Sequence, residues 1–194
     1  KGQALMFGSA FHRLKEGYLK DELLEFEPPP YDAELVKKLF NVWRDWYEVQ
    51  GYTHIQVEQP LTIPMDYGDD HILFTVTPDG LLSDTNGELW LDETKTTGSF
   101  DEDRLHLDLQ GRTQMLSAQQ LGHDVAGVKY TQVRKSNPDT ARVEILKEFT
   151  VRFSEGALRD AALTIDYALR NIVMYRKGLD TGYLDVDMAM IRNS

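Results

Sequence analysis

Residues Thr77–Thr97 read T-P-D-G-L-L-S-D-T-N-G-E-L-W-L-D-E-T-K-T-T, and they predict the centre of the fold. Two apolar segments flank a polar turn that holds the pair Asn86-Gly87. Both members of such a pair tolerate the positive φ that a tight hairpin turn requires. The stretch therefore predicts a β-hairpin whose outgoing strand spans Glu88–Thr96.

Charged side chains converge in this predicted hairpin. Side chains alternate along a strand, so Glu93 and Lys95 project to one face of the outgoing strand. Asp92 and Thr94 project to the other face. Asp79 on the incoming strand lies about as far from the turn as Glu93 does. The two carboxylates are therefore expected side by side, with the lysine next to them.

Two carboxylates and a lysine at a strand end suit metal-assisted hydrolysis of a phosphodiester. Mg²⁺ takes oxygen ligands and keeps several waters, so one or two carboxylates hold it against a substrate phosphate. A nearby lysine can position or deprotonate the attacking water. The alternative is a surface hairpin with a cross-strand ion pair, which contributes roughly tenths of a kcal/mol. Asp79 directly after Pro78, and three charges within Asp92–Lys95, favour the metal site.

Length and composition indicate one domain, because 194 residues with 41% apolar side chains can bury a sizeable core. We divide it into an N-terminal helical part (1–50), a catalytic core (51–153) and a C-terminal helix and tail (154–194). The sequence has no cysteine, which excludes disulfides, thiolate zinc sites and cysteine-ligated iron–sulfur clusters. No apolar run approaches the ~20 residues of a membrane span, which favours a cytoplasmic protein. The chain begins at Lys1 without an initiator Met, which indicates processing or trimming.

The net charge of −11 is unusual for a protein that binds nucleic acid, because phosphate binding normally rests on Lys and Arg. An acidic surface away from the site, combined with a divalent cation at the site, reconciles this charge with a DNA substrate. A protein substrate or partner would also fit the charge.

Two helices are expected before the first strand. The first spans Leu5–Leu24, with Ser9 as a candidate N-cap, and the second is the amphipathic segment Ala33–Gln50. Trp43 and Trp46 lie on the apolar side of the second helix, so core packing is favoured over a role in base stacking.

Strands and helices alternate through the rest of the chain. Thr53–Leu61 is expected to be a strand, followed by a polar loop at 64–70 and a second strand at 71–77. After the hairpin, the pattern predicts a helix that ends at Gly122, then two strands and a long helix. Their expected ranges are Leu109–Leu121, Val125–Lys135, Ala141–Phe153 and Ser154–Lys177. This order predicts an α/β fold with a small mixed sheet flanked by helices.

Pro78-Asp79 followed by Glu93-Thr94-Lys95, with a hairpin turn between them, resembles the signature of the PD-(D/E)XK nucleases. The resemblance implies a restriction-endonuclease-like core and a deoxyribonuclease that depends on Mg²⁺ or Mn²⁺, with one or two ions bound. It implies no iron–sulfur cluster here, because the cysteine cluster that many relatives carry near this end of the chain is missing.

Two further motifs resemble the RecB-like branch of that superfamily. Gly8-x-x-x-His12 resembles its first motif, in which a helical histidine reaches the metal from the side opposite the strands. A lone helical histidine is more often a packed or surface residue, so the motif carries this assignment. The helix with Gln110 resembles the Q-x-x-x-Y helix of the branch, although Gln114 stands where that pattern has tyrosine.

The resemblance implies a role for each site residue. The expected metal ligands are His12, Asp79, Glu93 and the Thr94 carbonyl oxygen. Lys95 would position or deprotonate the attacking water, and Gln110 would orient Lys95 or the phosphate. The candidate substrate contacts are Gln114, Arg112, Arg134 and Lys135. Glu16 and Glu58 are candidates for residues that hold the metal ligands in place. The alternatives are that Glu58 is a solvent-exposed charge on an edge strand and that Arg112 is a solvated charge on its helix.

DNA is the expected partner, and a recombination or replication protein is a second one. The resemblance implies exonuclease action on DNA ends in a bacterial or phage-infected cell; the residues alone leave exonuclease and endonuclease action open. Two alternatives stand beside this interpretation. One is a non-catalytic nuclease-fold module that binds DNA or a protein, and the other is an unrelated metal hydrolase that acts on small phosphoesters.

Overall fold

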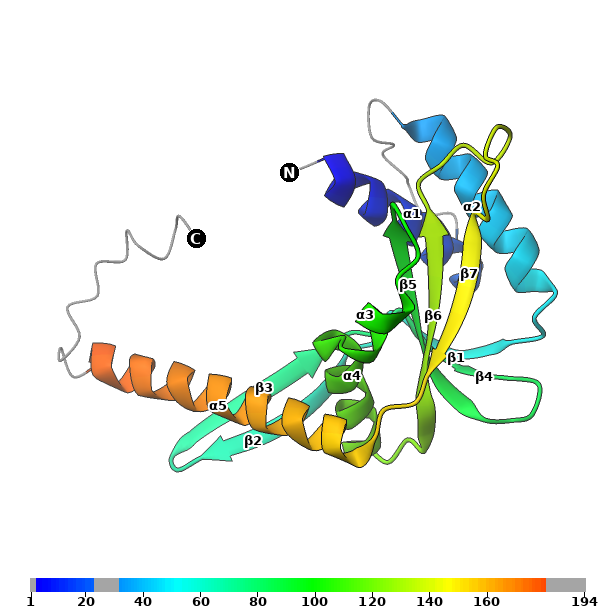
Figure 1. Cartoon of the computed structure of the whole chain (residues 1–194). Coiled ribbons are helices and arrows are strands. Elements are labelled where there is room, and N and C mark those ends of the chain that lie inside the picture. The colour runs from blue at the N-terminus through cyan, green and yellow to red at the C-terminus, as the bar shows by residue number, and fades with distance from the viewer. Residues whose placement is uncertain (1–2, 23–31, 181–194) are drawn as a thin grey trace.

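A mixed five-stranded sheet in the order β1-β4-β5-β6-β7 lies at the centre of the computed structural model, which describes residues 3–22 and 32–180 (Figure 1). The strands are β1 (Thr53–Val57), β4 (Gly80–Ser83), β5 (Leu89–Thr97), β6 (Val125–Arg134) and β7 (Leu146–Val151). β5 and β6 run parallel, and the other neighbours are antiparallel. The expected α/β fold with a small mixed sheet flanked by helices is confirmed.

Helices cover both faces of this sheet. The helices are α1 (Gln3–Lys20), α2 (Ala33–Glu48), α3 (Glu102–His106), α4 (Leu109–Gln120) and α5 (Glu155–Asp180). α1 and α2 lie on one side, whereas α3 and α4 form the crossover between the parallel strands β5 and β6 on the other side (Figure 1). α5 lies against α4 and extends past the sheet. None of the described helices is long and apolar enough to cross a membrane.

Two buried clusters join these layers. Between α1, α2 and the sheet, Phe11 and Trp43 are almost completely buried, which confirms the core-packing interpretation of Trp43. On the other face, Met115 of α4 packs with residues of the sheet. α4 can approach β6 closely because Gly111 has no side chain; a Cβ there would lie 1.9 Å from the Tyr130 hydroxyl oxygen.

The predicted hairpin is formed by β4 and β5, but its turn is longer than a two-residue turn. Gly87 has φ +81°, whereas Asn86 is not among the described residues with positive φ. The Asp84 carboxylate instead accepts hydrogen bonds from the backbone N–H groups of Asn86 and Glu88, and its second oxygen accepts one from the Trp90 indole. An aspartate that satisfies local backbone donors is a common way to fix such a loop.

The prediction for residues 53–77 was partly wrong. β1 ends at Val57, and β2 (Leu61–Tyr67) pairs with β3 (Asp70–Val76) in a separate two-stranded sheet. The segment expected to be a polar loop is therefore mostly strand, with its turn at Gly68, φ +66°. Proline has no backbone N–H to donate. Pro64 is tolerated in β2 because this strand is paired along one edge only, and its other edge needs no N–H donors.

Several predicted boundaries also move. Ser9 is not an N-cap: it lies inside α1, and its hydroxyl donates to the Leu5 carbonyl oxygen. The helix α3 precedes the predicted helix α4 and was not predicted, and the last strand begins at Leu146 rather than Ala141. The predicted end of the first helix at Leu24 and the tail at 181–194 lie outside the described residues.

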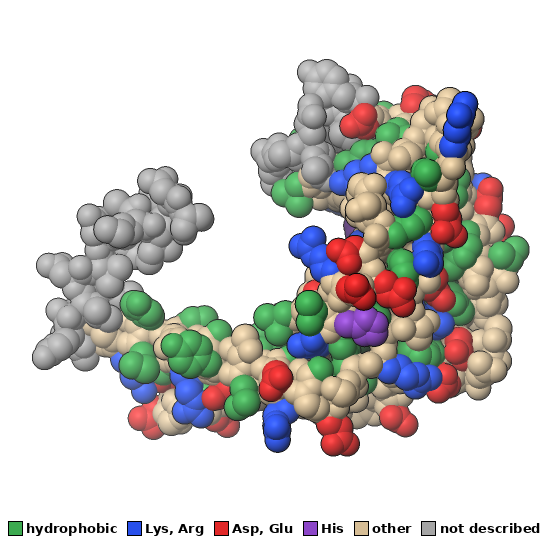
Figure 2. Space-filling model, viewed as in Figure 1, with side chains coloured by type: hydrophobic (Ala, Val, Ile, Leu, Met, Phe, Trp, Pro, Cys, Tyr) green, Lys and Arg blue, Asp and Glu red, His purple; other side chains and the backbone are tan. Residues whose placement is uncertain are grey.

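The surface combines both charge signs with exposed apolar groups. On the face shown in Figure 2, acidic side chains lie between basic ones, and apolar side chains follow α5. Exposed apolar residues of α5 include Leu163, Tyr167 and Met174. The net negative charge of the chain therefore does not make this face uniformly acidic.

Candidate metal-dependent active site

The hairpin, α1 and α4 bring most of the predicted residues to one open pocket of about 490 Å³. Gly80 pairs with Asp92 across the hairpin, so Asp79 lies next to Glu93, as the sequence predicts. The wall of this pocket, which we call the metal pocket, includes His12, Glu58, Asp79, Glu93, Thr94, Lys95, Gln110 and Lys135. Residues far apart in the chain therefore form one site.

Asp79 is held in one orientation by donors on one of its two oxygens. Its Oδ2 accepts hydrogen bonds from the Thr94 backbone N–H at 2.7 Å and from Lys15 Nζ at 3.0 Å. Its Oδ1 lies 3.3 Å from His12 Nδ1. Burial would raise the pKa of Asp79, but the Lys15 charge, followed by His12 and the Thr94 N–H, holds it well below its usual range. Asp79 is therefore an ionised carboxylate with Oδ1 directed toward the metal pocket.

Lys15 is a site residue that the sequence analysis missed. Its side chain is almost completely buried, and its ammonium lies 2.8 Å from Asp92 Oδ2 and 2.6 Å from Thr94 Oγ1, in addition to Asp79. It lies three residues after His12, so the two share a face of α1. That spacing was the available signal, because a lysine on the buried face of a helix requires an acidic partner.

The charge network continues behind Lys15. Asp92 Oδ2 also lies 3.1 Å from His54 Nε2, and His54 Nδ1 lies 2.6 Å from the Tyr47 hydroxyl oxygen. Burial would raise the pKa of Asp92, but Lys15 and then His54 lower it. Two carboxylates on opposite sides of one buried ammonium are therefore both kept ionised.

Glu93 is the second acidic group expected from the hairpin, and it is 3% exposed. Its Oε1 accepts from Lys95 Nζ and Gln110 Nε2, each at 2.8 Å, and its Oε2 accepts from Gln114 Nε2 at 3.0 Å. Burial, followed by the charge of Asp79, raises the pKa of Glu93 to about 7. Glu93 therefore gains a negative charge only near neutral pH when no cation is bound.

Lys95 and Gln110 form the open side of the same arrangement. Lys95 Nζ donates to Gln110 Oε1 at 2.8 Å as well as to Glu93, and its side chain is 32% exposed. The glutamine thus holds both the lysine and the glutamate. Lys95 has a fixed ammonium that still reaches the pocket.

Three side chains of the metal pocket could hold a divalent cation. One donor atom each from His12, Glu58 and Asp79 lie within 4.8 Å of one another. An imidazole nitrogen with two carboxylate oxygens suits Mn²⁺ or Mg²⁺. Burial, followed by Asp79, raises the pKa of Glu58. Burial would lower the pKa of His12, but Asp79 raises it. The negative charge of Asp79 contributes to both shifts, and a bound cation would offset that charge.

Glu58 belongs to this donor group, whereas the sequence analysis expected it only as a support. The reason is a change of backbone direction after β1. Glu58 has φ +50°, and its N–H donates to the Asp79 carbonyl oxygen at 3.0 Å. A non-glycine residue in this region costs roughly 1 kcal/mol or more and is often found at functional sites. The alternation of apolar and polar residues in the sequence does not predict this backbone conformation.

Three predicted residues are not brought into the metal pocket. Arg112 donates to the His106 carbonyl oxygen, and its guanidinium lies over the Phe153 ring. The Arg134 guanidinium lies 4.4 Å from the Phe100 ring centre. Glu16 is bonded to Lys20 on the surface of α1. The two arginines were predicted from their charge and Glu16 from the family resemblance, but the arginines contact aromatic rings and Glu16 pairs with Lys20.

The remaining two predicted residues are near the site in different ways. Lys135 lines the metal pocket, with its ammonium 5.4 Å from the Phe7 ring centre. Gln114 is 1% exposed and touches Glu93 rather than the open pocket. Gln114 is therefore a support for Glu93, not a surface for substrate.

Replacing Glu93 with glutamine should change the pH dependence of stability. In EDTA, the wild-type protein stabilises protonated Glu93, so this contribution is present at acidic pH and is lost as pH rises through about 7. The variant has no such loss. Between pH 5.5 and 8.5 we therefore expect the Tm of the variant to rise relative to that of the wild type. The corresponding change in the free energy of unfolding is on the order of 1–3 kcal/mol. Parallel Tm curves for the two proteins, measured by differential scanning calorimetry, would contradict the prediction.

Comparison with known proteins adds little to this geometry. No protein family matches the sequence, and no curated protein matches it. Solved structures do match, among them one titled "Crystal structure of SSO0001". That chain is 14% identical, with a TM-score of 0.37, over 81% of this chain and 70% of the other. The chemistry of the site therefore rests on its own residues.

Proposed function

We propose that this chain is a Mg²⁺- or Mn²⁺-dependent deoxyribonuclease that hydrolyses phosphodiester bonds. The observation that carries the proposal is the position of Lys95 in the same pocket as the donor group His12, Glu58 and Asp79. Glu93 and Gln110 fix the lysine ammonium there. An ion site and a fixed lysine in one open pocket are the parts that phosphodiester hydrolysis requires. Action on DNA ends, in the cytoplasm of a bacterial or phage-infected cell, is the form of the activity implied by the resemblance.

Each residue has a distinct task in this proposal. His12, Glu58 and Asp79 would hold the cation, with Glu93 beside them. The bound cation supplies positive charge at the scissile phosphate and lowers the pKa of a bound water. Lys95 holds the attacking water at its ammonium. The water gives up one proton to solvent as its oxygen forms the new P–O bond, the bond to the leaving sugar oxygen breaks, and the leaving oxygen takes up a proton from solvent.

The direct test uses linear DNA and closed-circular DNA, each with Mg²⁺, Mn²⁺ or EDTA. Loss of linear DNA alone, with either metal and not with EDTA, is the expected result. Nicking of the circle would keep the site and change the activity to endonuclease. Asp79→Asn is the control for contaminating nuclease, because it removes a charge that the metal pocket uses. Absence of cleavage with both metals would overturn the proposal.

A non-catalytic module that binds DNA or a protein is the second candidate, and the net charge of −11 favours it. It predicts binding without cleavage. Retention of Lys95 with its partners Glu93 and Gln110 is unnecessary in such a module, because binding alone does not require a fixed lysine beside a cation site.

A further inference from the structure

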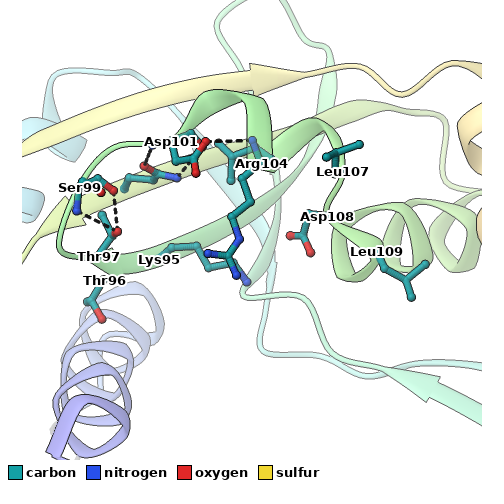
Figure 3. Close-up of a pocket in the computed structure, with 11 residues that line it drawn as sticks. Lys95, Thr96, Thr97, Ser99, Asp101, Arg104, Leu107, Asp108 and Leu109 are labelled. Atoms are coloured by element: carbon teal, nitrogen blue, oxygen red, sulfur yellow. Dashed lines mark hydrogen bonds between the residues drawn. The ribbon is translucent and has the colours of Figure 1, made fainter.

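A second pocket adjoins the metal pocket at the end of β5. Its volume is about 740 Å³, and Lys95 and Thr96 line both pockets. α3 and the segment that leads into α4 form its other wall (Figure 3). A polymer that places one phosphate in the metal pocket can therefore place a neighbouring unit here.

Arg104 and Lys95 are the two positive groups that line this second pocket, which we call the Arg104 pocket. Figure 3 shows the Arg104 side chain extending from α3 toward Lys95. Its guanidinium forms no ion pair with any residue of 3–22 or 32–180. An arginine that is not neutralised can bind a phosphate with two parallel N–H···O bonds.

The two carboxylates in the wall do not compete for this arginine, because the fold already uses them. Asp101 caps α3 by accepting from the Arg104 backbone N–H. Asp108 accepts from the Gln110 backbone N–H and from the Tyr130 hydroxyl. The cationic side chains that line the pocket, and that the phosphate of a ligand could reach, are Arg104 and Lys95.

Apolar surface lies on the same wall. Leu107 and Leu109 are 72% and 46% exposed, and both line the pocket. Exposed leucines beside an arginine match a ligand with an anionic group and an apolar face. A nucleotide has both, as its phosphate is anionic and its sugar and base offer apolar faces.

We propose that the Arg104 pocket binds the nucleotide adjacent to the scissile phosphate on the strand that is cut. Arg104 binds the phosphate of that nucleotide, and Leu107 and Leu109 lie against its sugar or base. This inference rests on the proposed nuclease function and adds the position of the neighbouring nucleotide to it.

The test compares two substrates of different length in Mn²⁺. Bis(p-nitrophenyl) phosphate fills only the metal pocket, whereas a single-stranded oligonucleotide reaches both pockets. We expect Arg104→Ala to lower kcat/KM for the oligonucleotide by about 10-fold, which corresponds to a loss of about 1.4 kcal/mol. Hydrolysis of bis(p-nitrophenyl) phosphate should be unchanged.

Binding of the oligonucleotide in Ca²⁺ gives a second readout. One lost phosphate contact should reduce the slope of log K against log[salt] by about 0.7 for a single strand. Leu107→Ser should weaken binding without changing that slope. Arg152→Ala is the matched control, because Arg152 is bonded to Glu88 at the other end of β5.

The outcomes separate the two proposals. If the wild type hydrolyses neither substrate, the proposed function fails. If the wild type cleaves and Arg104→Ala equals it in both rate and salt slope, the nuclease stands and the Arg104 pocket assignment fails. An equal loss on both substrates would also overturn the assignment, since Arg104 would then act on the reaction centre or the fold.

Discussion

Lys95→Met should reduce the single-turnover rate of DNA cleavage by about 10²–10⁴-fold, the usual contribution of a side chain that handles the attacking water. The ammonium of Lys95 is held at 2.8 Å from both Glu93 Oε1 and Gln110 Oε1, so the variant loses a positive charge at a fixed position in the metal pocket. Methionine keeps an unbranched side chain only one atom shorter than that of lysine. The fold should therefore be retained, and Tm should stay close to that of the wild type.

Metal affinity separates this role from a role in ion binding. His12, Glu58 and Asp79 form the donor group without Lys95, so Mn²⁺ titrations by calorimetry should give similar Kd values for variant and wild type. Lys135→Met is the matched control, because it removes another lysine from the wall of the metal pocket. We expect it to raise KM and to leave the single-turnover rate at saturation nearly unchanged. Near-wild-type cleavage by Lys95→Met with metal bound would exclude the proposed role of the lysine.

The central hairpin could be predicted because local rules determine it. Alternation along one strand places Glu93 and Lys95 on a common face, and pairing across a short turn places Asp79 beside Glu93. The same rules assign Asp92 and Thr94 to the opposite face, where α1 lies. These relations need no knowledge of distant contacts, so they hold even though the turn itself has a different geometry.

The parts of the site that the sequence did not reveal depend on contacts between distant segments. Lys15 and Asp92 meet only when α1 lies on the sheet. Glu58 reaches the metal pocket because its backbone has φ +50° after β1 ends. Arg112 and Arg134 illustrate the reverse case: their charges were read as phosphate contacts, but nearby aromatic rings hold both side chains.

The second large effect is expected from Lys15, whose ammonium joins Asp79 to Asp92 inside the protein. All three side chains are at least nine-tenths buried, with relative exposures of 2%, 8% and 5%. Removal of the one cation would leave two carboxylates close together with little water to stabilise them. Breaking a buried ion pair from one side typically costs 3–5 kcal/mol, so roughly this loss is expected for Lys15→Met.

The loss should depend on pH, and a cation should partly reverse it. In the wild type Lys15 keeps the pKa of Asp79 low, so the paired carboxylates stabilise the fold above their unfolded pKa. In Lys15→Met the carboxylates favour protonation, so the variant should lose stability as pH rises from 5 to 8. Mn²⁺ should raise the free energy of unfolding of the variant by more than that of the wild type, because the ion replaces a positive charge beside Asp79. Urea unfolding at several pH values, with and without Mn²⁺, measures all three effects.

Two further variants test whether the charge, rather than the packing of the side chain, is responsible. Lys20→Met on the same helix removes an exposed lysine that is bonded to Glu16, and surface pairs of this kind contribute about 0–1 kcal/mol. Asp92→Asn in the Lys15→Met background removes one of the two stranded charges, so it should recover part of the lost stability. If the two changes instead add independently, the ammonium does not couple to Asp92. If the double variant recovers stability but binds Mn²⁺ more weakly than the wild type does, Lys15 also orients Asp79 for the ion, because its ammonium donates to Oδ2 and leaves Oδ1 directed at the metal pocket.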